Sequence, residues 1–220
     1  MKESKSIPVK ITPPVLTGLS ESEVAFAGLA GKEDTIADLS FDRQVVEGVT
    51  VNSLALNNCK FSNVVFSDCS FKNMQLTDVR FENCDLSNVF FAGSSFFRVE
   101  FVSCKLVGTD LSASTFNHVT VKNCGGQYCN CFMGKMRHVL FSETDFRNGS
   151  FADCKFTGVG FEVCNLTEAE FLHTSLSGVD LSSSKVSAMR LSIPDLKGVI
   201  VNSQQALELT SFLGIVINDI

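Results

Sequence analysis

The sequence predicts an all-β protein, a parallel β-helix of about eight short coils. Two observations lead to this fold class. A bulky apolar residue recurs at every fifth position between Phe141 and Leu181, and a small residue stands two places before each one. A period of five matches neither a helix face, which repeats every 3.6 residues, nor a strand, which repeats every 2. Positions twenty apart also agree, since one such series reads Val79, Val99, Val119, Val139, Val159, Val179 and Val199.

The repeat units themselves carry a resemblance to a known family. Stretches such as Cys84-Asp85-Leu86-Ser87-Asn88 and Cys164-Asn165-Leu166-Thr167 resemble the pentapeptide-repeat family, whose consensus is Ala-Asp/Asn-Leu-X-X. The resemblance implies a right-handed quadrilateral parallel β-helix with four pentapeptides in each coil. Within the family the chain is similar to the quinolone-resistance (Qnr-type) proteins, especially the chromosomal kind from Gram-positive bacteria. This likeness covers nearly the whole chain, including residues 203–217.

Three segments follow from the repeat. Residues 1–35 are expected to be an N-terminal cap over the first coil, because the open end of a stacked solenoid exposes unpaired strand groups and apolar core. Within this cap, Ser20 and Glu23 fit a capping box before a short helix, although Phe26 also falls on the five-residue phase. Residues 36–201 are expected to form the β-helix, and residues 202–220 a C-terminal helix and strand. The unbroken phase leaves no room for the projecting loops of the plasmid-borne relatives.

The weakest coil is the glycine-rich stretch of residues 124–134, where Gly126 stands at a position for a large inward side chain. Two interpretations remain open: the coil bends around an altered core, which we favour, or it is loosened for function. A Phe at position 126 would fill the volume, and we expect Met136 and Phe146 to fill it instead.

After Val201 the repeat gives way to an apolar ending. Ser203 is expected to cap a helix over residues 204–213, Gly214 suits its C-terminal cap, and residues 215–217 resemble a short strand. An apolar end on a polar protein favours a two-fold homodimer joined end to end. The resemblance implies the same end for dimerisation. The predicted dimer interface contains Leu207, Leu209, Phe212, Leu213, Ile215 and Ile217.

Composition limits the possible partners. The net charge of −6 disfavours direct nucleic-acid binding, which depends on Lys and Arg. No apolar run is long enough to span a membrane, and the first residues lack the apolar core of a signal peptide. We therefore expect a cytoplasmic protein. Eight of the nine cysteines fall in the small inward position and Cys131 in the large one, which favours buried thiols over disulfides.

The charges sort by side of the predicted coil, which suggests a binding surface. Acidic residues gather on one flank: Glu82, Glu100, Glu143, Glu162, Asp180, Asp85 and Asp145. A stiff acidic rod of DNA-like proportions predicts a DNA mimic. The Qnr-type resemblance implies the partner, DNA gyrase or topoisomerase IV, and protection from fluoroquinolones. Phe90 and Phe97, at outward positions on adjacent sides, are a second candidate contact patch.

Nothing in the sequence points to catalysis, a metal or another cofactor. His118 and His138 share one column without a carboxylate placed to orient them, and the residues of a conceivable zinc site, Cys124, Cys129 and Cys131, fall on successive sides. We therefore expect a non-enzymatic protein without cofactors. Two alternatives remain: a structural or interaction protein with another partner, or a self-protection protein against a toxin that targets gyrase.

Overall fold

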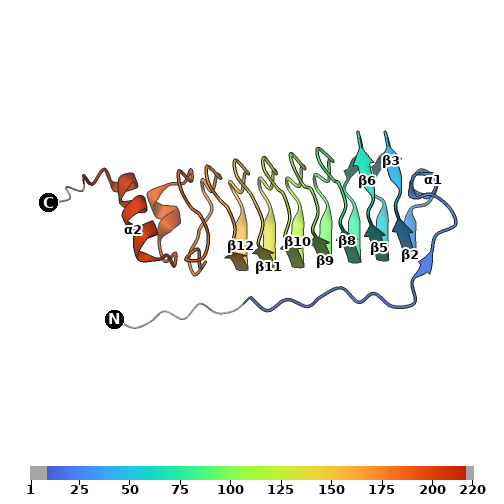
Figure 1. Cartoon of the computed structure of the whole chain (residues 1–220), viewed down its shortest axis with the longest axis horizontal. Helices are drawn as coiled ribbons and strands as arrows, with labels where there is room; N and C mark the ends of the chain where they lie inside the picture. Colours follow the sequence, from blue (N-terminus) through green and yellow to red (C-terminus); the bar gives the residue numbers. More distant parts are fainter. Residues whose placement is uncertain (1–8, 217–220) are drawn as a thin grey trace.

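The protein is an elongated parallel β-solenoid of about seven turns in a computed structural model that describes residues 9–216 (Figure 1). Each turn contributes one long strand to a single sheet. Its strands, in spatial order, are β1 (Ser20–Glu21), β2 (Thr35–Asp42), β5 (Ala55–Ser62), β8 (Gln75–Glu82), β9 (Ser95–Val102), β10 (Thr115–Lys122), β11 (Lys135–Ser142) and β12 (Lys155–Glu162). Two short pairs, β3 (Val45–Glu47) with β6 (Val65–Ser67) and β4 (Thr50–Asn52) with β7 (Ser70–Lys72), form two further sides.

The register confirms the twenty-residue coil. Val119 lies opposite Val99 on one neighbouring strand and opposite Val139 on the other. Beyond the last long strand the same spacing continues as single bridges, the last of which joins Asp180 to Ile200. The β-helix class is therefore confirmed. About seven turns carry the sheet, against the eight predicted, because the last coil is held by bridges and not by strands.

The interior is built from stacked aromatic rings. Phe61 lies 4.9 Å from Phe81 and Phe81 lies 5.1 Å from Phe101, measured between ring centroids, and both pairs are nearly parallel. The stacking distance matches the spacing of neighbouring strands, about 4.8 Å. Burying such side chains is worth about 1.5–3 kcal/mol each, so the five-residue repeat supplies most of the stability of the fold.

The small inward residues satisfy the backbone at the corners. The Thr144 hydroxyl contacts the Val121 carbonyl oxygen and accepts a hydrogen bond from the Cys124 amide. All nine cysteines are free and buried, as expected from their inward positions. Burial is the main cause that raises the pKa of the Cys59 and Cys164 thiols to about 11. These cysteines serve as small core residues, not as reactive thiols.

One residue at nearly every corner has left-handed backbone geometry, which explains the frequent Asn, Asp, Gly and His there. Asn63 and Asn83 have φ values of 56° and 54°. Short polar side chains and glycine tolerate this region far better than branched ones. Longer side chains such as Arg98 and Met133 also occur at these corners, and among the described residues Val163, at φ 56°, is the one with a β-branched side chain.

The glycine-rich coil keeps the regular register, so neither predicted irregularity is seen. Gly125 bridges to Lys105 and to Asp145 on the two neighbouring coils. The volume at Gly126 is already occupied, because a methyl group at this position would lie 2.7 Å from Cε1 of Phe146. The expectation that Phe146 fills the gap is confirmed. Met136, the other residue expected there, does not contribute any of the three nearest atoms, which belong to Phe146 and Asp145.

The N-terminal residues do more than cap the first coil. The helix α1 (Phe26–Ala30) covers that end, with the Phe26 ring 5.4 Å from Phe41 and 5.1 Å from Phe61. Residues 9–19, which we call the strap, instead run along the length of the solenoid (Figure 1). Within residues 9–35 a cap is therefore formed only near α1, and residues 1–8 of the expected cap lie outside the described residues.

The C-terminal end is covered by short helices: η1 (Ile193–Leu196), α2 (Ser203–Leu209) and η2 (Thr210–Leu213). The N-cap of α2 is Asn202 and not Ser203, and its side chain accepts a hydrogen bond from the Gln205 amide. Gly214 has the expected left-handed conformation, with φ 67°. The predicted strand over residues 215–217 is absent at Ile215 and Val216, and Ile217 lies outside the described residues.

Candidate functional site

The acidic residues predicted as a binding flank occupy two neighbouring sides of the coil, and most of them have cationic partners. On the first side, Arg80 lies between Glu82 and Glu100, with nitrogen–oxygen distances of 3.1 and 2.9 Å. Lys60 contacts the other oxygen of Glu82 at 2.9 Å. These cations lower the pKa of Glu82, the Lys60 hydrogen bond most strongly. This part of the flank is a network of alternating charge.

The second side repeats this pairing. Asp85 contacts the Lys105 ammonium group at 3.2 Å, and Asp145 contacts the Arg147 guanidinium group at 2.7 Å. Burial raises the pKa of both carboxyls, but hydrogen bonds from Ser87 and Arg147, respectively, outweigh it and hold each pKa below its usual value. Both carboxylates therefore stay ionised, and their charge is largely neutralised by a neighbour.

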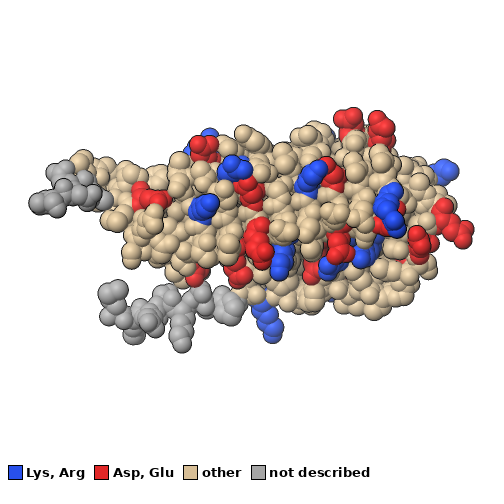
Figure 2. All heavy atoms as spheres, viewed as in Figure 1, with Lys and Arg blue, Asp and Glu red and all other residues tan. Residues whose placement is uncertain are grey.

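Negative charge is less compensated in the C-terminal half of the flank. Glu143 contacts Lys122 only at 3.7 Å, and both side chains are about half exposed. Glu162 is exposed on the next coil, and Asp180, one coil further, accepts a hydrogen bond from the Ser182 hydroxyl at 2.6 Å. Figure 2 shows red and blue residues interspersed over one face of the molecule. The surface is therefore mildly acidic with mixed charges, and it is not a continuous acidic strip.

Phe90 and Phe97 lie on different sides of the coil and have different surroundings. Phe90 is 48% exposed, and its backbone forms β-bridges to Ser70 and Asp110 on the two neighbouring coils. Phe97 is half-buried in β9, where the Arg98 guanidinium carbon lies 4.3 Å from its ring centre and His118 approaches its edge. Phe97 thus already has packing partners in the chain, whereas Phe90 is a single exposed apolar residue, which is common on protein surfaces.

The residues predicted to form the dimer interface include several exposed apolar side chains at the C-terminal end. Leu207, Leu213 and Ile215 are 59%, 57% and 51% exposed. Leu209 and Phe212 are half-buried, and Phe212 packs against the core. Val216, which the sequence analysis did not include, is 82% exposed beside them. The structure therefore gathers the described interface residues at one end of the rod, next to α2.

A further surface, which sequence reasoning missed, lies beneath the strap. Side chains twenty residues apart bind its backbone: Asn58 and Asp78 accept hydrogen bonds from the Thr17 and Val15 amides at 3.2 and 2.9 Å. His118 accepts one from the Thr12 amide at 3.1 Å. The signal was present as a column of polar residues at left-handed corners, but nothing in the sequence connects that column to residues 9–19.

No metal centre or membrane helix is found in the part of the chain that the structure describes. Within residues 9–216, no three His, Cys, Asp or Glu side chains gather as ligands for a metal ion. None of the helices formed by these residues has the length and apolar character that crossing a bilayer requires.

Comparisons with known proteins identify the repeat. A family model described as a pentapeptide repeat region matches residues 74–151, and a second, described as pentapeptide repeats, matches residues 55–82 and 141–183. The curated proteins contain no match.

Three solved structures resemble this chain to different degrees. A trypsin-treated form of QnrB1, described as a plasmid-mediated fluoroquinolone resistance protein, is 20% identical with a TM-score of 0.53, over 82% of this chain and 100% of that one. HetL, a heterocyst-differentiation protein of the cyanobacterium Nostoc, is 12% identical over 79% of this chain and 94% of its own, with a TM-score of 0.38. A thylakoid-lumen protein of Arabidopsis thaliana is 20% identical over 58% and 75%, with a TM-score of 0.36.

Proposed function

Because the chain belongs to the pentapeptide-repeat family, we propose that it binds DNA gyrase or topoisomerase IV and protects these enzymes from fluoroquinolones. The observation that carries this proposal is the stiff, loop-free solenoid, whose fold spans the whole of a resistance protein, QnrB1. The proposal includes membership of the chromosomal Qnr-type group from Gram-positive bacteria and a cytoplasmic location beside the target enzyme.

The proportions of the rod suit a groove that accepts DNA. Seven coils at about 4.8 Å extend about 34 Å, and two chains joined at their C-terminal ends extend about 70 Å. That length corresponds to about 20 base pairs at 3.4 Å per step. Mimicry in this proposal depends on shape first, because the pairing of Glu82, Glu100, Asp85 and Asp145 with cations reduces their field.

The acidic contribution is assigned to Glu143 and Glu162. These two residues lie on successive coils of one side, in the half of the rod nearest the C-terminal end. In an end-to-end dimer both copies would place these carboxylates toward the centre of the rod. A basic groove on the partner would gain most from the charges that neighbours in the chain neutralise least, and Lys122 contacts Glu143 only at 3.7 Å.

A supercoiling assay with purified gyrase, relaxed plasmid and ciprofloxacin tests the function. We expect added protein to restore supercoiling, and the Glu143→Gln, Glu162→Gln double variant to require several-fold more protein for the same rescue. A control pair, Glu33→Gln with Glu47→Gln, makes the same charge change at the opposite end of the rod and should behave as the wild type. If micromolar protein neither rescues nor inhibits supercoiling, gyrase is excluded as the partner. If topoisomerase IV is also unaffected, the alternative of a different partner remains.

The homodimer is tested separately by light scattering after size exclusion. Leu207→Glu or Leu213→Glu should give monomers, because a dimer would bury an unpaired charge at the contact. Val45→Glu is the matched control, since Val45 is 71% exposed near the other end of the solenoid. Dimers that persist in both C-terminal variants would refute this interface, and monomeric wild type would refute the dimer itself.

A further inference from the structure

The strap is attached along a flank of the solenoid by few contacts. Thr17 binds Asn58 and Thr12 binds His118, three coils further along the solenoid, so the strap runs back toward later coils as its residue numbers decrease. Three coils measure about 14 Å and five extended residues about 16 Å, so the strap crosses the strands as an extended chain. Its half-buried side chains face the flank: Val9, Ile11, Pro14, Leu16 and Leu19.

We propose that residues 9–14 form a detachable latch that His118 controls: the neutral imidazole holds the latch closed by accepting the Thr12 amide hydrogen, and protonation of His118 releases it. The distance from the Thr12 nitrogen to Nδ1 of His118 is 3.1 Å. Only an unprotonated ring nitrogen accepts a hydrogen bond, and both nitrogens of the cationic ring are donors. Protonation therefore replaces an attraction at this contact with two opposed N–H groups.

Burial and three basic neighbours disfavour the cationic form of His118. The His138 ring from β11 stacks on it at 4.8 Å, Arg137 lies on the same strand, and Arg98 projects from β9. The carboxylate of Asp78 accepts hydrogen bonds from Arg98 and from the strap amide of Val15. Burial, then His138, then Arg137 and Arg98 lower the pKa of His118 below its usual value of 6.5.

Only part of this environment changes when the latch opens. Arg98, Arg137 and His138 stay in place, whereas the Thr12 hydrogen bond, which only the neutral ring accepts, is lost. The pKa of His118 is thus lower with the latch closed than with it open, so opening is accompanied by proton uptake. The closed state is fully favoured above about pH 6.5 and loses stability as the pH falls below that value.

The two halves of the strap differ in this respect. Asn58, which exchanges two hydrogen bonds with Thr17, does not titrate. The Arg98 hydrogen bond keeps the pKa of Asp78 below 3.8, so this acceptor stays ionised far below neutral pH. Residues 15–19 therefore remain bound between pH 8 and pH 5, and only the half bound to His118 responds.

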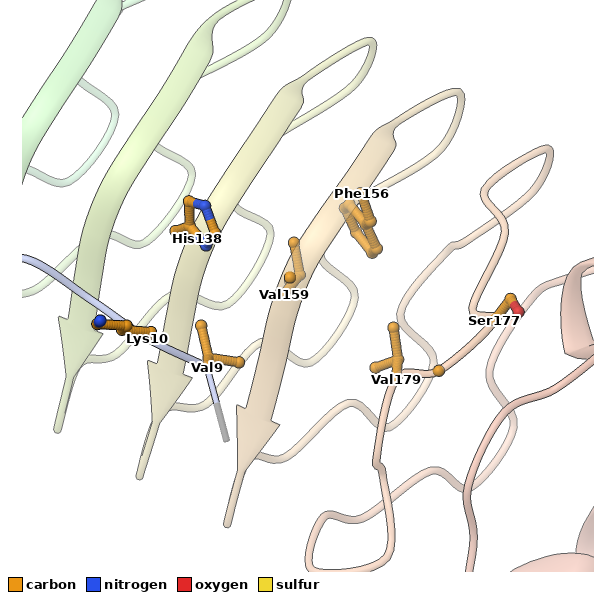
Figure 3. Close-up of a pocket in the computed structure, with 9 residues that line it drawn as sticks. Val9, Lys10, His138, Phe156, Val159, Ser177 and Val179 are labelled. Atoms are coloured by element: carbon orange, nitrogen blue, oxygen red, sulfur yellow. The ribbon is translucent and has the colours of Figure 1, made fainter. Parts of the chain in front are cut away.

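A second contact shows that residues 9–14 of the strap have a defined binding position on the solenoid. A methyl group at Gly160 would lie 2.9 Å from Cγ2 of Val9 and 3.3 Å from Cδ1 of Leu140. Val9 therefore occupies the space that a side chain at position 160 would take. Next to it, Val9, Lys10 and His138 line a hollow of about 370 Å³ (Figure 3), to whose lining Gly158 and Gly178 also belong. Opening the latch would uncover Leu140 and this hollow, and Leu140 lies two coils from Glu100 in the same column of the sheet.

Nuclear magnetic resonance on the full chain tests the latch without reference to any partner. The titration of His118 is followed by its ring nitrogens, and the latch by amide protection factors and ¹⁵N relaxation at residues 9–17. Between pH 7.5 and pH 5.5 we expect protection at Thr12 to fall, by at most about tenfold for one linked proton on a histidine whose open-state pKa does not exceed the usual value of about 6.5, while Val15 and Thr17 keep theirs.

Three variants make the result decisive. His118→Gln offers an acceptor that does not titrate, so Thr12 should stay protected at both pH values. His138→Gln should retain the pH response, and Gly160→Val should expose residues 9–11 at both pH values by filling the seat of Val9. Unchanged Thr12 protection in the wild type while His118 titrates would overturn the proposal, as would a full pH response in His118→Gln.

Discussion

Adding one methyl group to the glycine-rich coil should destabilise the protein, although Gly→Ala is usually harmless or helpful. Gly126 has no left-handed φ, so alanine meets no backbone strain there, and its smaller unfolded-state entropy would by itself stabilise by about 0.4–1 kcal/mol. The methyl group would, however, lie 2.7 Å from Cε1 and 2.8 Å from Cδ1 of Phe146. That ring is 1% exposed and cannot retreat, because Phe141 and Phe151 lie 5.1 and 5.3 Å from it.

Overpacking of this kind costs about 1–3 kcal/mol, so the net destabilisation of Gly126→Ala should be about 1–2 kcal/mol. For a chain of this size the melting temperature should fall by about 2–8 °C, which differential scanning calorimetry resolves. Gly125→Ala is the matched control, since its methyl group meets only the Gln127 side chain at 3.4 Å. Phe146→Leu should lower the cost of Gly126→Ala, with a coupling of about 0.5–3 kcal/mol. A Gly126→Ala protein as stable as the Gly125→Ala control would refute this account of the core.

The remaining predictions concern the core, one strained corner and the ion pairs. Phe151→Ala should lower the free energy of unfolding by about 3–5 kcal/mol in urea, because Phe151 is fully buried among four other rings; a shift under 1 kcal/mol would contradict this. Val163→Asn should raise the melting temperature by about 2–4 °C, since relieving a β-branched residue at φ 56° recovers about 1 kcal/mol; a lower value would mean that Val163 is not strained. The ion pairs of Asp78 and Glu82 lower the pKa of both carboxyls, so their contribution to the free energy of unfolding is present above about pH 4.5 and is lost as the pH falls through 3.8 and below. Melting curves between pH 7 and pH 3 would follow this loss. An unchanged melting temperature over this range would contradict the ion pairs.

The fold was predictable because the sizes of the repeated residues determine which side chains pack inside each coil. A large and a small inward side chain in every five residues determine the coil, and columns such as Val79 to Val199 determine its length of twenty. Gly126 departs from this rule, because it places no side chain at a large inward position, and what fills the space there depends on ring positions. Whether Phe146 or a cavity fills that space cannot be read from residue types, since it depends on the rotamer of one side chain.

The charge pattern of the candidate surface was only partly predictable. Assigning carboxylates to sides of the coil placed Glu82 and Glu100 correctly as neighbours, but not the cation between them. Arg80 reaches one coil forward to Glu100 and also contacts Glu82, so it acts on the second coil as strongly as on its own. Counting residues along a side overestimates the acidity of a surface wherever long cationic side chains connect successive coils.

The strap was not predictable because it obeys no repeat. Its position depends on three acceptors contributed by different coils, Asn58, Asp78 and His118, and on a glycine that leaves room for Val9. Each residue is ordinary at a left-handed corner, where Asn, Asp, His and Gly are all favoured, so the corner requirement hides the binding role. This overlap also explains why a titratable acceptor occurs at the distal end of the strap. At neutral pH, histidine suits the left-handed corner and accepts the hydrogen bond as well as asparagine does. The two residues differ only when the pH changes.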